Sequence, residues 1–349
     1  MVCSKKIIGN LFECYALLLL DYNQSKHLVV ASEKNDKCLL YDLEGNYEET
    51  IWEGPGGVMS MEQVPGTNGQ FLTTQLFYST NHSEKANISI VTPVSEANWD
   101  IRVLADLPFV HRFGIIQRDG IKYLLAATVK SAHAFEEDWT CPGRLWAAEL
   151  PENLSVFDKE HQLGMKPIMS GLFHNHGFQK IEDNGYTSVL IGSDNGVIKC
   201  IPPKSKGGEW GFETLLAEAA SDMIMLDFDG DGETELLTMA PFHGDMLSIY
   251  KKSDGQYKKI YENKEKLEFL HAIWGGSLLG IPTAIIGYRR GKKELLAIRC
   301  SDKDKLEFTL ETVDRDVGPA NVLHYTRNGT DYFLSANREI NEIALYQIG

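Results

Sequence analysis

A unit of two apolar strands joined by a tight turn recurs seven times along this 349-residue sequence. In the most regular copy an apolar segment, residues 223–226, leads through an acidic turn to a second one, residues 236–239. In another copy Asn184 and Gly185 form the two-residue turn that is typical of a β-hairpin. The copies begin near Tyr15, Val58, His111, His176, Asp222, His271 and Asn321. Their spacing of about fifty residues is that of a four-stranded blade, and it predicts an all-β fold, a seven-bladed β-propeller.

The last copy is short and indicates how the ring closes. From Asn321 to the end of the sequence there is room for three strands only. Residues 5–12, which precede the first copy, are apolar enough to supply the missing outer strand. A blade completed from both termini leaves no open sheet edge at the junction. We therefore predict a single propeller domain over residues 1–349, with strand 5–12 joined to the C-terminal blade.

The composition and the missing motifs disfavour several classes of partner and of chemistry. A formal net charge of −15 disfavours nucleic acid, which binds to basic surfaces. No apolar run approaches the length of a membrane span, and the six cysteines form no close pair. Phosphate-binding glycine loops and the nucleophile elbow of serine hydrolases are also absent from the sequence. We expect a cytoplasmic protein that binds neither nucleic acid nor membrane.

The acidic turn of the fifth copy has the pattern of a calcium loop. Its carboxylates alternate along the chain, and Gly232 allows the sharp turn between them: Asp227, Asp229, Asp231, Glu233 and Glu235. Ca²⁺ takes six to eight hard oxygen ligands, which this spacing can wrap around one ion. The alternative is an acidic turn without an ion. A loop of this kind between the first two strands of a blade resembles the FG-GAP repeat of integrin-like propellers, which implies structural Ca²⁺.

Imidazoles and a carboxylate stand at the starts of four consecutive copies: His111, His176, Asp222 and His271. Because the first strands of neighbouring blades converge on the axis, these side chains are expected to meet in the central channel. Such a set suits a divalent metal ion, either Zn, Mn or Mg. The alternative is that each histidine only forms a structural hydrogen bond there.

The connections between second and third strands provide the remaining candidates. The one in the third copy, residues 130–146, is unusually long, and long loops in compact folds are often functional. For catalysis we select His133 or His243 as the base, with Arg144 and Tyr288 assisting the leaving oxygen. For substrate binding we select Trp139, Glu136, Arg289 and Arg338. The alternative is a solvated, charged rim.

The histidines at the blade starts and the segment from His133 to Trp146 resemble the propeller domain of the aldos-2-ulose dehydratase group. That resemblance implies a carbon–oxygen lyase that eliminates water from a keto-sugar with a metal-assisted base, and hence a small carbohydrate substrate. A polysaccharide lyase is a second possibility. A third is a non-catalytic propeller that binds carbohydrate or protein and holds Ca²⁺ for structure only.

Overall fold

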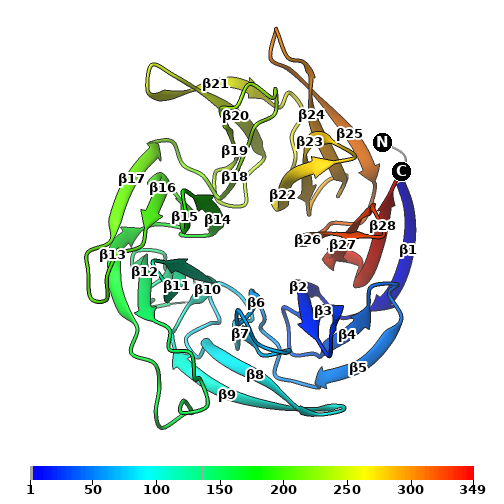
Figure 1. The fold of residues 1–349 in the computed structure, drawn as a ribbon. Coiled ribbons are helices and arrows are strands. Elements are labelled where there is room, and N and C mark those ends of the chain that lie inside the picture. The colour runs from blue at the N-terminus through cyan, green and yellow to red at the C-terminus, as the bar shows by residue number, and fades with distance from the viewer. Residues whose placement is uncertain (1–2, 136) are drawn as a thin grey trace.

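The computed structural model describes residues 3–135 and 137–349, and over them 28 strands form seven four-stranded sheets. Figure 1 shows the sheets as blades of a ring, each with its first strand nearest the axis. The prediction of an all-β, seven-bladed propeller is confirmed. Besides strands, the described residues contain one short 3₁₀ turn, Arg338–Ile340. No helix among them is long and apolar enough to cross a membrane.

The first three blades are consecutive in the chain. Blade one contains β2 (Cys14–Tyr22), β3 (Ser25–Ser32), β4 (Cys38–Asp42) and β5 (Tyr47–Trp52). Blade two contains β6 (Met61–Gln63), β7 (Phe71–Gln75), β8 (Asn87–Ser95) and β9 (Asn98–Asp106). Blade three contains β10 (Val110–Arg118), β11 (Ile121–Lys130), β12 (Pro142–Glu149) and β13 (Lys166–Leu172).

The next three blades follow the same plan. Blade four contains β14 (Gly177–Asp183), β15 (Tyr186–Ser193), β16 (Gly196–Ile201) and β17 (Gly211–Leu216). Blade five contains β18 (Asp222–Leu226), β19 (Glu235–Ala240), β20 (Met246–Ser253) and β21 (Gln256–Glu262). Blade six contains β22 (Leu270–Leu278), β23 (Ile281–Tyr288), β24 (Leu295–Asp302) and β25 (Glu307–Asp314).

Blade seven joins the two ends of the chain. It contains β26 (Asn321–Arg327), β27 (Thr330–Asn337), β28 (Glu342–Ile348) and, on the outside, β1 (Cys3–Asn10). Strand β1 runs antiparallel to β28, with Cys3 opposite Ile348, and the termini lie side by side in Figure 1. The predicted closure by the N-terminal strand is therefore confirmed.

Apolar side chains fill the spaces between neighbouring blades. Leu28 and Val30 of blade one pack with Leu334 and Ile343 of blade seven, all fully buried. This packing continues the core across the point where the ring closes. Burial of apolar surface between blades is what stabilises a propeller as a whole.

Blade two begins later than its sequence suggests. We placed its start at Val58, but β6 begins at Met61. The side-chain oxygen of Thr74 accepts hydrogen bonds from the backbone N–H groups of Met59 and Ser60 (2.7 and 3.1 Å). The hydroxyl thus replaces the ladder partner that these residues would have in a regular strand.

Candidate functional site

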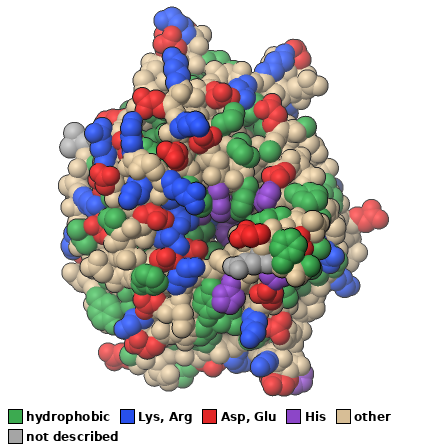
Figure 2. Space-filling view, turned by 180° about the vertical axis from the view of Figure 1, so that it is seen from behind, with side chains coloured by type: hydrophobic (Ala, Val, Ile, Leu, Met, Phe, Trp, Pro, Cys, Tyr) green, Lys and Arg blue, Asp and Glu red, His purple; other side chains and the backbone are tan. Residues whose placement is uncertain are grey.

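Three of the four blade-start side chains meet at the axis. His111 lies in β10, His176 directly precedes β14, and His271 lies in β22, and each is at most 3% exposed. The ring centroid of His176 lies 4.5 Å from that of His111 and 5.4 Å from that of His271. Histidine side chains are visible in the hollow at the centre of the face shown in Figure 2. The blade register therefore brings together imidazoles from blades three, four and six.

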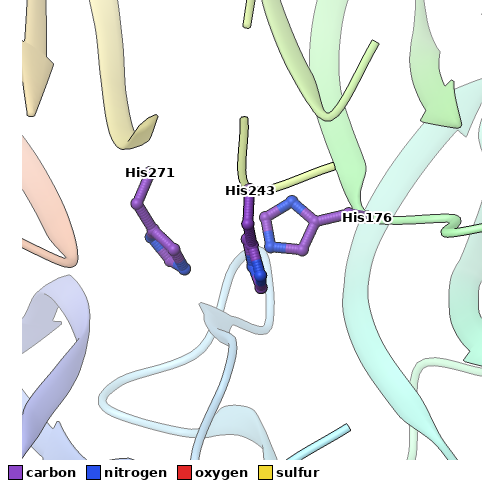
Figure 3. A group of neighbouring side chains, drawn as sticks. All are labelled: His176, His243 and His271. Carbon is purple, nitrogen blue, oxygen red and sulfur yellow. The ribbon is translucent and has the colours of Figure 1, made fainter. Parts of the chain in front are cut away.

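A fourth imidazole joins them from the connection between β19 and β20. His243 has a left-handed backbone (φ 49°), and its ring centroid lies 5.1 Å from that of His176 and 5.6 Å from that of His271. One ring nitrogen from each of these three residues lies within 4.8 Å of the others. Figure 3 shows the three side chains reaching from separate segments toward a common point. We call His176, His243 and His271 the histidine triad; it can hold a metal ion.

Backbone carbonyls orient two members of the triad. Nδ1 of His176 donates to the carbonyl of Ser221 (3.1 Å), and Nδ1 of His271 donates to that of Ala320 (2.6 Å). Because a carbonyl only accepts, the proton of each neutral ring is on Nδ1 and the lone pair on Nε2. Hydrogen bonds of this kind orient metal-binding histidines. The buried Nε2 of His176 has no hydrogen-bond partner among the described residues, as expected for a free ligand atom.

The surroundings keep the triad neutral. Burial holds the pKa of His176 and of His271 well below the usual range, and the charges of Arg112 and Arg289 act in the same direction. Burial, followed by Arg289, lowers the pKa of His243 to about 3. Neutral imidazole is the form that binds a metal ion or accepts a proton.

Tyr15, from blade one, links two of the rings. Its hydroxyl lies 3.1 Å from Nε2 of His271 and 3.4 Å from Nε2 of His111. Burial raises the pKa of Tyr15 to about 12, so the hydroxyl stays protonated. It donates to His271 and accepts from Nε2–H of His111, which leaves Nδ1 of His111 without a partner among the described residues. A metal ion on Nε2 of His271 would have to displace this hydroxyl.

Asp222 and His111 do not belong to the triad, although both were selected as ligands of the channel metal. The carboxylate of Asp222 is buried and accepts a hydrogen bond from the N–H of Met223 (3.0 Å). Burial raises the pKa of this carboxyl to about 6. His243, which was selected as a base, lies where we expected those two ligands.

A row of aromatic rings covers the triad at the mouth of the channel. Five rings follow one another with successive centroids 3.9–4.7 Å apart: Trp139, His174, Phe242, His243 and Phe269. Successive rings are stacked, except that Trp139 is tilted relative to His174. The guanidinium groups of two arginines lie over the face of Phe269 at 4.8 and 4.7 Å. We call the five residues from Trp139 to Phe269 in this sequence of rings, without the arginines, the aromatic row. Because four of these rings stack on one another, the row forms a continuous wall of aromatic side chains beside the triad.

His174 adds an oriented base to this row. Its Nδ1 lies 2.7 Å from a carboxylate oxygen of Asp194, and its ring stacks on Phe242 at 4.7 Å. Like His243 and Phe269 it has a left-handed backbone, with φ of 47°. Bulky residues rarely adopt this conformation, and such residues cluster at functional sites. The sequence signal for this residue was its position two residues before His176.

Several selected residues lie elsewhere. His133 pairs with Glu84, and its ring packs on Phe109 at 5.5 Å. The hydroxyl of Tyr288 donates to Glu294 (2.5 Å), and its ring is buried between blades five and six, so it does not face the channel. No contact joins either residue to the triad among the described residues.

The remaining selected residues lie either at the two ends of the aromatic row or at the rim of the channel. Arg144 lies over the ring of Trp146 at 5.7 Å. Arg289 lies over Phe269, at the triad, while Trp139 stands at the other end of the row. Arg338 is paired with Glu13, Glu33 and Glu339 and so has no charge to spare for a ligand. Glu136 lies outside the described residues.

The acidic loop of blade five contains an internal cation. The ammonium of Lys251, on β20, lies 2.7–2.8 Å from carboxylate oxygens of Asp229, Asp231 and Glu235. Asp227 instead accepts hydrogen bonds from the backbone N–H groups of Gly230 and Gly232. Oxygens of Asp227, Asp229 and Glu235 are close enough to share an ion. The expected Ca²⁺ remains a prediction, and it would have to compete with this lysine.

The comparisons with known proteins support the fold but identify no family and no function. No family model matches the chain, and no curated protein sequence matches it, so the resemblances to FG-GAP repeats and to the aldos-2-ulose dehydratase group remain predictions. Among solved structures, that of a streptogramin B lyase is similar over 99% of this chain and 98% of its own, with a TM-score of 0.59. The two sequences are 12% identical, so the likeness is one of fold alone.

Proposed function

We propose that this protein is a metal-dependent lyase that eliminates an oxygen substituent next to a carbonyl group in a small carbohydrate. The observation that carries the proposal is the histidine triad, with neutral rings, carbonyl-oriented Nδ1 atoms and a buried, unpartnered Nε2 on His176. Three imidazoles that leave a coordination position open are typical of a catalytic metal site rather than of a structural one. The similarly folded protein named streptogramin B lyase is compatible with this reaction class but does not argue for it.

The reaction needs a base, an acid and a group that stabilises negative charge. A base removes the proton from the carbon next to the carbonyl, the electron pair forms a carbon–carbon double bond, and the neighbouring C–O bond breaks. The departing oxygen takes up a proton and leaves as water or as an alcohol. A divalent ion bound by the triad would supply Lewis acidity for the carbonyl oxygen.

His174 is the base that the geometry favours. Asp194 holds its Nδ1, which directs the other ring nitrogen away from the carboxylate, and the ring lies in the aromatic row beside the triad. His133 has the same pairing with a carboxylate, that of Glu84, but no contact with the row or the triad among the described residues. Arg289, which lies over Phe269, could stabilise an oxyanion at the mouth of the site, in competition with Glu339, to which it donates a hydrogen bond (2.8 Å).

Metal content and product formation test the proposal together. We expect purified protein to hold about one equivalent of a divalent transition metal, measured by elemental analysis, and to form an enone from a keto-sugar, seen by its ultraviolet absorbance. In His176→Ala both the metal and the product are expected to be lost. His161→Ala is the matched control, because His161 is exposed and, among the described residues, forms an ion pair with Asp158 alone. Metal-loaded protein that forms no enone from a broad panel of keto-sugars would leave a binding propeller as the better description.

A further inference from the structure

A cavity of about 390 Å³ lies further along the channel. Residues that follow the blade starts on the inner strands line it, among them Ser60, Arg112, Lys180, Trp274, Asn321 and His324. From His176, which directly precedes β14, to Lys180 within that strand the side chains change from buried to exposed, so this end of the channel meets solvent away from the aromatic row. We call this cavity the lower chamber.

Tyr15 connects the lower chamber with the histidines. Its hydroxyl contacts the imidazoles of His111 and His271, and the guanidinium of Arg112 lies 5.9 Å from the centre of its ring. The side-chain amide of Asn321 donates to the carbonyl of Tyr15 (2.9 Å). The lower chamber therefore begins directly below the layer of imidazoles.

Arg112 forms no salt bridge with a carboxylate among the described residues, although its charge opposes the burial that raises the pKa of Asp222. Its only hydrogen bond there is from a terminal nitrogen to the carbonyl of Met59 (3.2 Å), although a guanidinium carries five N–H donors. Glu62, which also lines the chamber, is occupied by the ammonium of Lys180 (2.5 Å) and the N–H of Ile115 (3.1 Å). No ion pair joins Arg112 to the buried Asp222.

The histidine that lines the chamber, His324, also has a carboxylate partner. Nε2 of His324 lies 2.9 Å from a carboxylate oxygen of Asp331, and its ring packs on Trp274 at 4.6 Å. At the opposite mouth Arg338 contacts three carboxylates. Arg112 has no such carboxylate contact among the described residues, and it lines a cavity large enough for a small molecule.

We propose that the lower chamber binds a small molecule with an oxyanion group, carboxylate or phosphate, and that Arg112 pairs with this group. A partly buried guanidinium without a salt bridge has N–H donors free for an anion, and its planar shape matches carboxylate and phosphate oxygens in bidentate geometry. The Trp274 ring offers an apolar face for the rest of the molecule, while Lys180 at the open end remains paired with Glu62. The site is separate from the triad and needs no metal.

Calorimetric titration of metal-free protein tests this site. The probes are glucuronate and inorganic phosphate, with glucose as a neutral control, in a low-salt Tris buffer. We expect one saturable site for at least one of the two anions and none for glucose; which anion binds identifies the group. In Arg112→Gln the affinity is expected to fall by at least about tenfold. In Arg112→Lys, which keeps the charge, weaker but saturable binding is expected.

Two variants serve as controls. Arg118→Gln removes a guanidinium from the same strand, where it bonds the carbonyl of Pro202 and lies over Tyr186, outside the chamber. It is expected to bind the anion like the wild type, as is His176→Ala, which separates this site from the triad. The proposal is overturned if the wild type binds neither anion saturably, or if Arg112→Gln binds it as tightly as the wild type. Either result is independent of whether the protein is a lyase.

Discussion

Two clusters in this propeller could surround a cation, and they differ in whether a side chain of the protein already occupies the cation position. In the acidic loop of blade five the ammonium of Lys251 contacts three carboxylates at 2.7–2.8 Å. In the histidine triad no lysine or arginine takes that place, and the buried Nε2 of His176 has no partner among the described residues. A similar concentration of ligand atoms thus has an internal cation in one region and an open coordination site in the other.

The difference follows from the charge of the ligands. Glu235 is fully buried and Asp229 nearly so, and buried carboxylates need a compensating charge. An imidazole can instead be buried in its neutral form, which is why burial lowers the pKa of His176 and His271 so strongly. Neutral rings need no counter-ion, so the triad can be buried without a metal ion, whereas the acidic loop needs a cation.

The largest effect should come from removing the internal cation. We expect Lys251→Met to lower the free energy of unfolding by about 3–5 kcal/mol, because it leaves buried carboxylates unpaired. The measurement is urea denaturation in the presence of a chelator. Added Ca²⁺ should stabilise Lys251→Met more than it stabilises the wild type, because the competing ammonium is gone.

The neighbouring lysine provides the control. Lys252 is exposed, and Lys252→Met should change stability by no more than about 0.5 kcal/mol. If Lys251→Met is as stable as Lys252→Met, the lysine does not hold the loop together and the contrast with the triad disappears. If Ca²⁺ stabilises the wild type as much as the variant, the ion and the lysine do not compete.

Sequence reasoning succeeded where the repeat itself sets the geometry. The blade starts placed His111, His176 and His271 at one end of neighbouring inner strands, and the structure brings them together. It failed where a contact comes from another part of a blade. Lys251 contacts Glu235 from the third strand of the blade, 16 residues later in the chain. The acidic pattern of the loop does not predict this contact.

Tyr15 and His243 show the same limit in the channel. Tyr15 comes from blade one, 256 residues from His271, and its hydroxyl can be placed only once the ring is closed. His243 joins the triad because a left-handed backbone turns its connection toward the axis. The sequence identified it as a channel residue but could not show that its ring lies within reach of a metal ion held by His176 and His271.

The pH dependence of stability should separate the triad from ordinary histidines. Burial lowers the pKa of His176 in the folded state below its unfolded value of about 6.5, so the unfolded chain binds the proton more readily. The stabilisation is therefore complete above pH 6.5 and is lost as the pH falls below it. Each such imidazole should contribute about 1.4 kcal/mol per pH unit to the slope. Denaturation of metal-free protein at pH 7, 6 and 5 measures it.

His176→Gln should reduce this slope, because glutamine cannot be protonated. His161→Gln should leave the slope as it is, because the His161 side chain is 77% exposed. Equal slopes in the wild type and in His176→Gln would mean that the imidazole is charged when buried, which would remove the basis for a metal site of neutral ligands.

The smallest effect concerns the hydroxyl that holds part of the triad. Tyr15→Phe removes the hydrogen bond to Nε2 of His271 and should cost about 1 kcal/mol of stability, whereas Tyr47→Phe, on an exposed tyrosine, should cost almost nothing. Because the hydroxyl competes with a metal ion for the same lone pair, Tyr15→Phe should also bind the ion a few-fold more tightly in a titration with Zn²⁺ or Mn²⁺. A weaker affinity would show that Tyr15 helps to hold the ion instead of competing with it. The triad would then differ from the acidic loop still further, because its neighbouring side chain would be part of the cation site, whereas Lys251 takes the place of the cation.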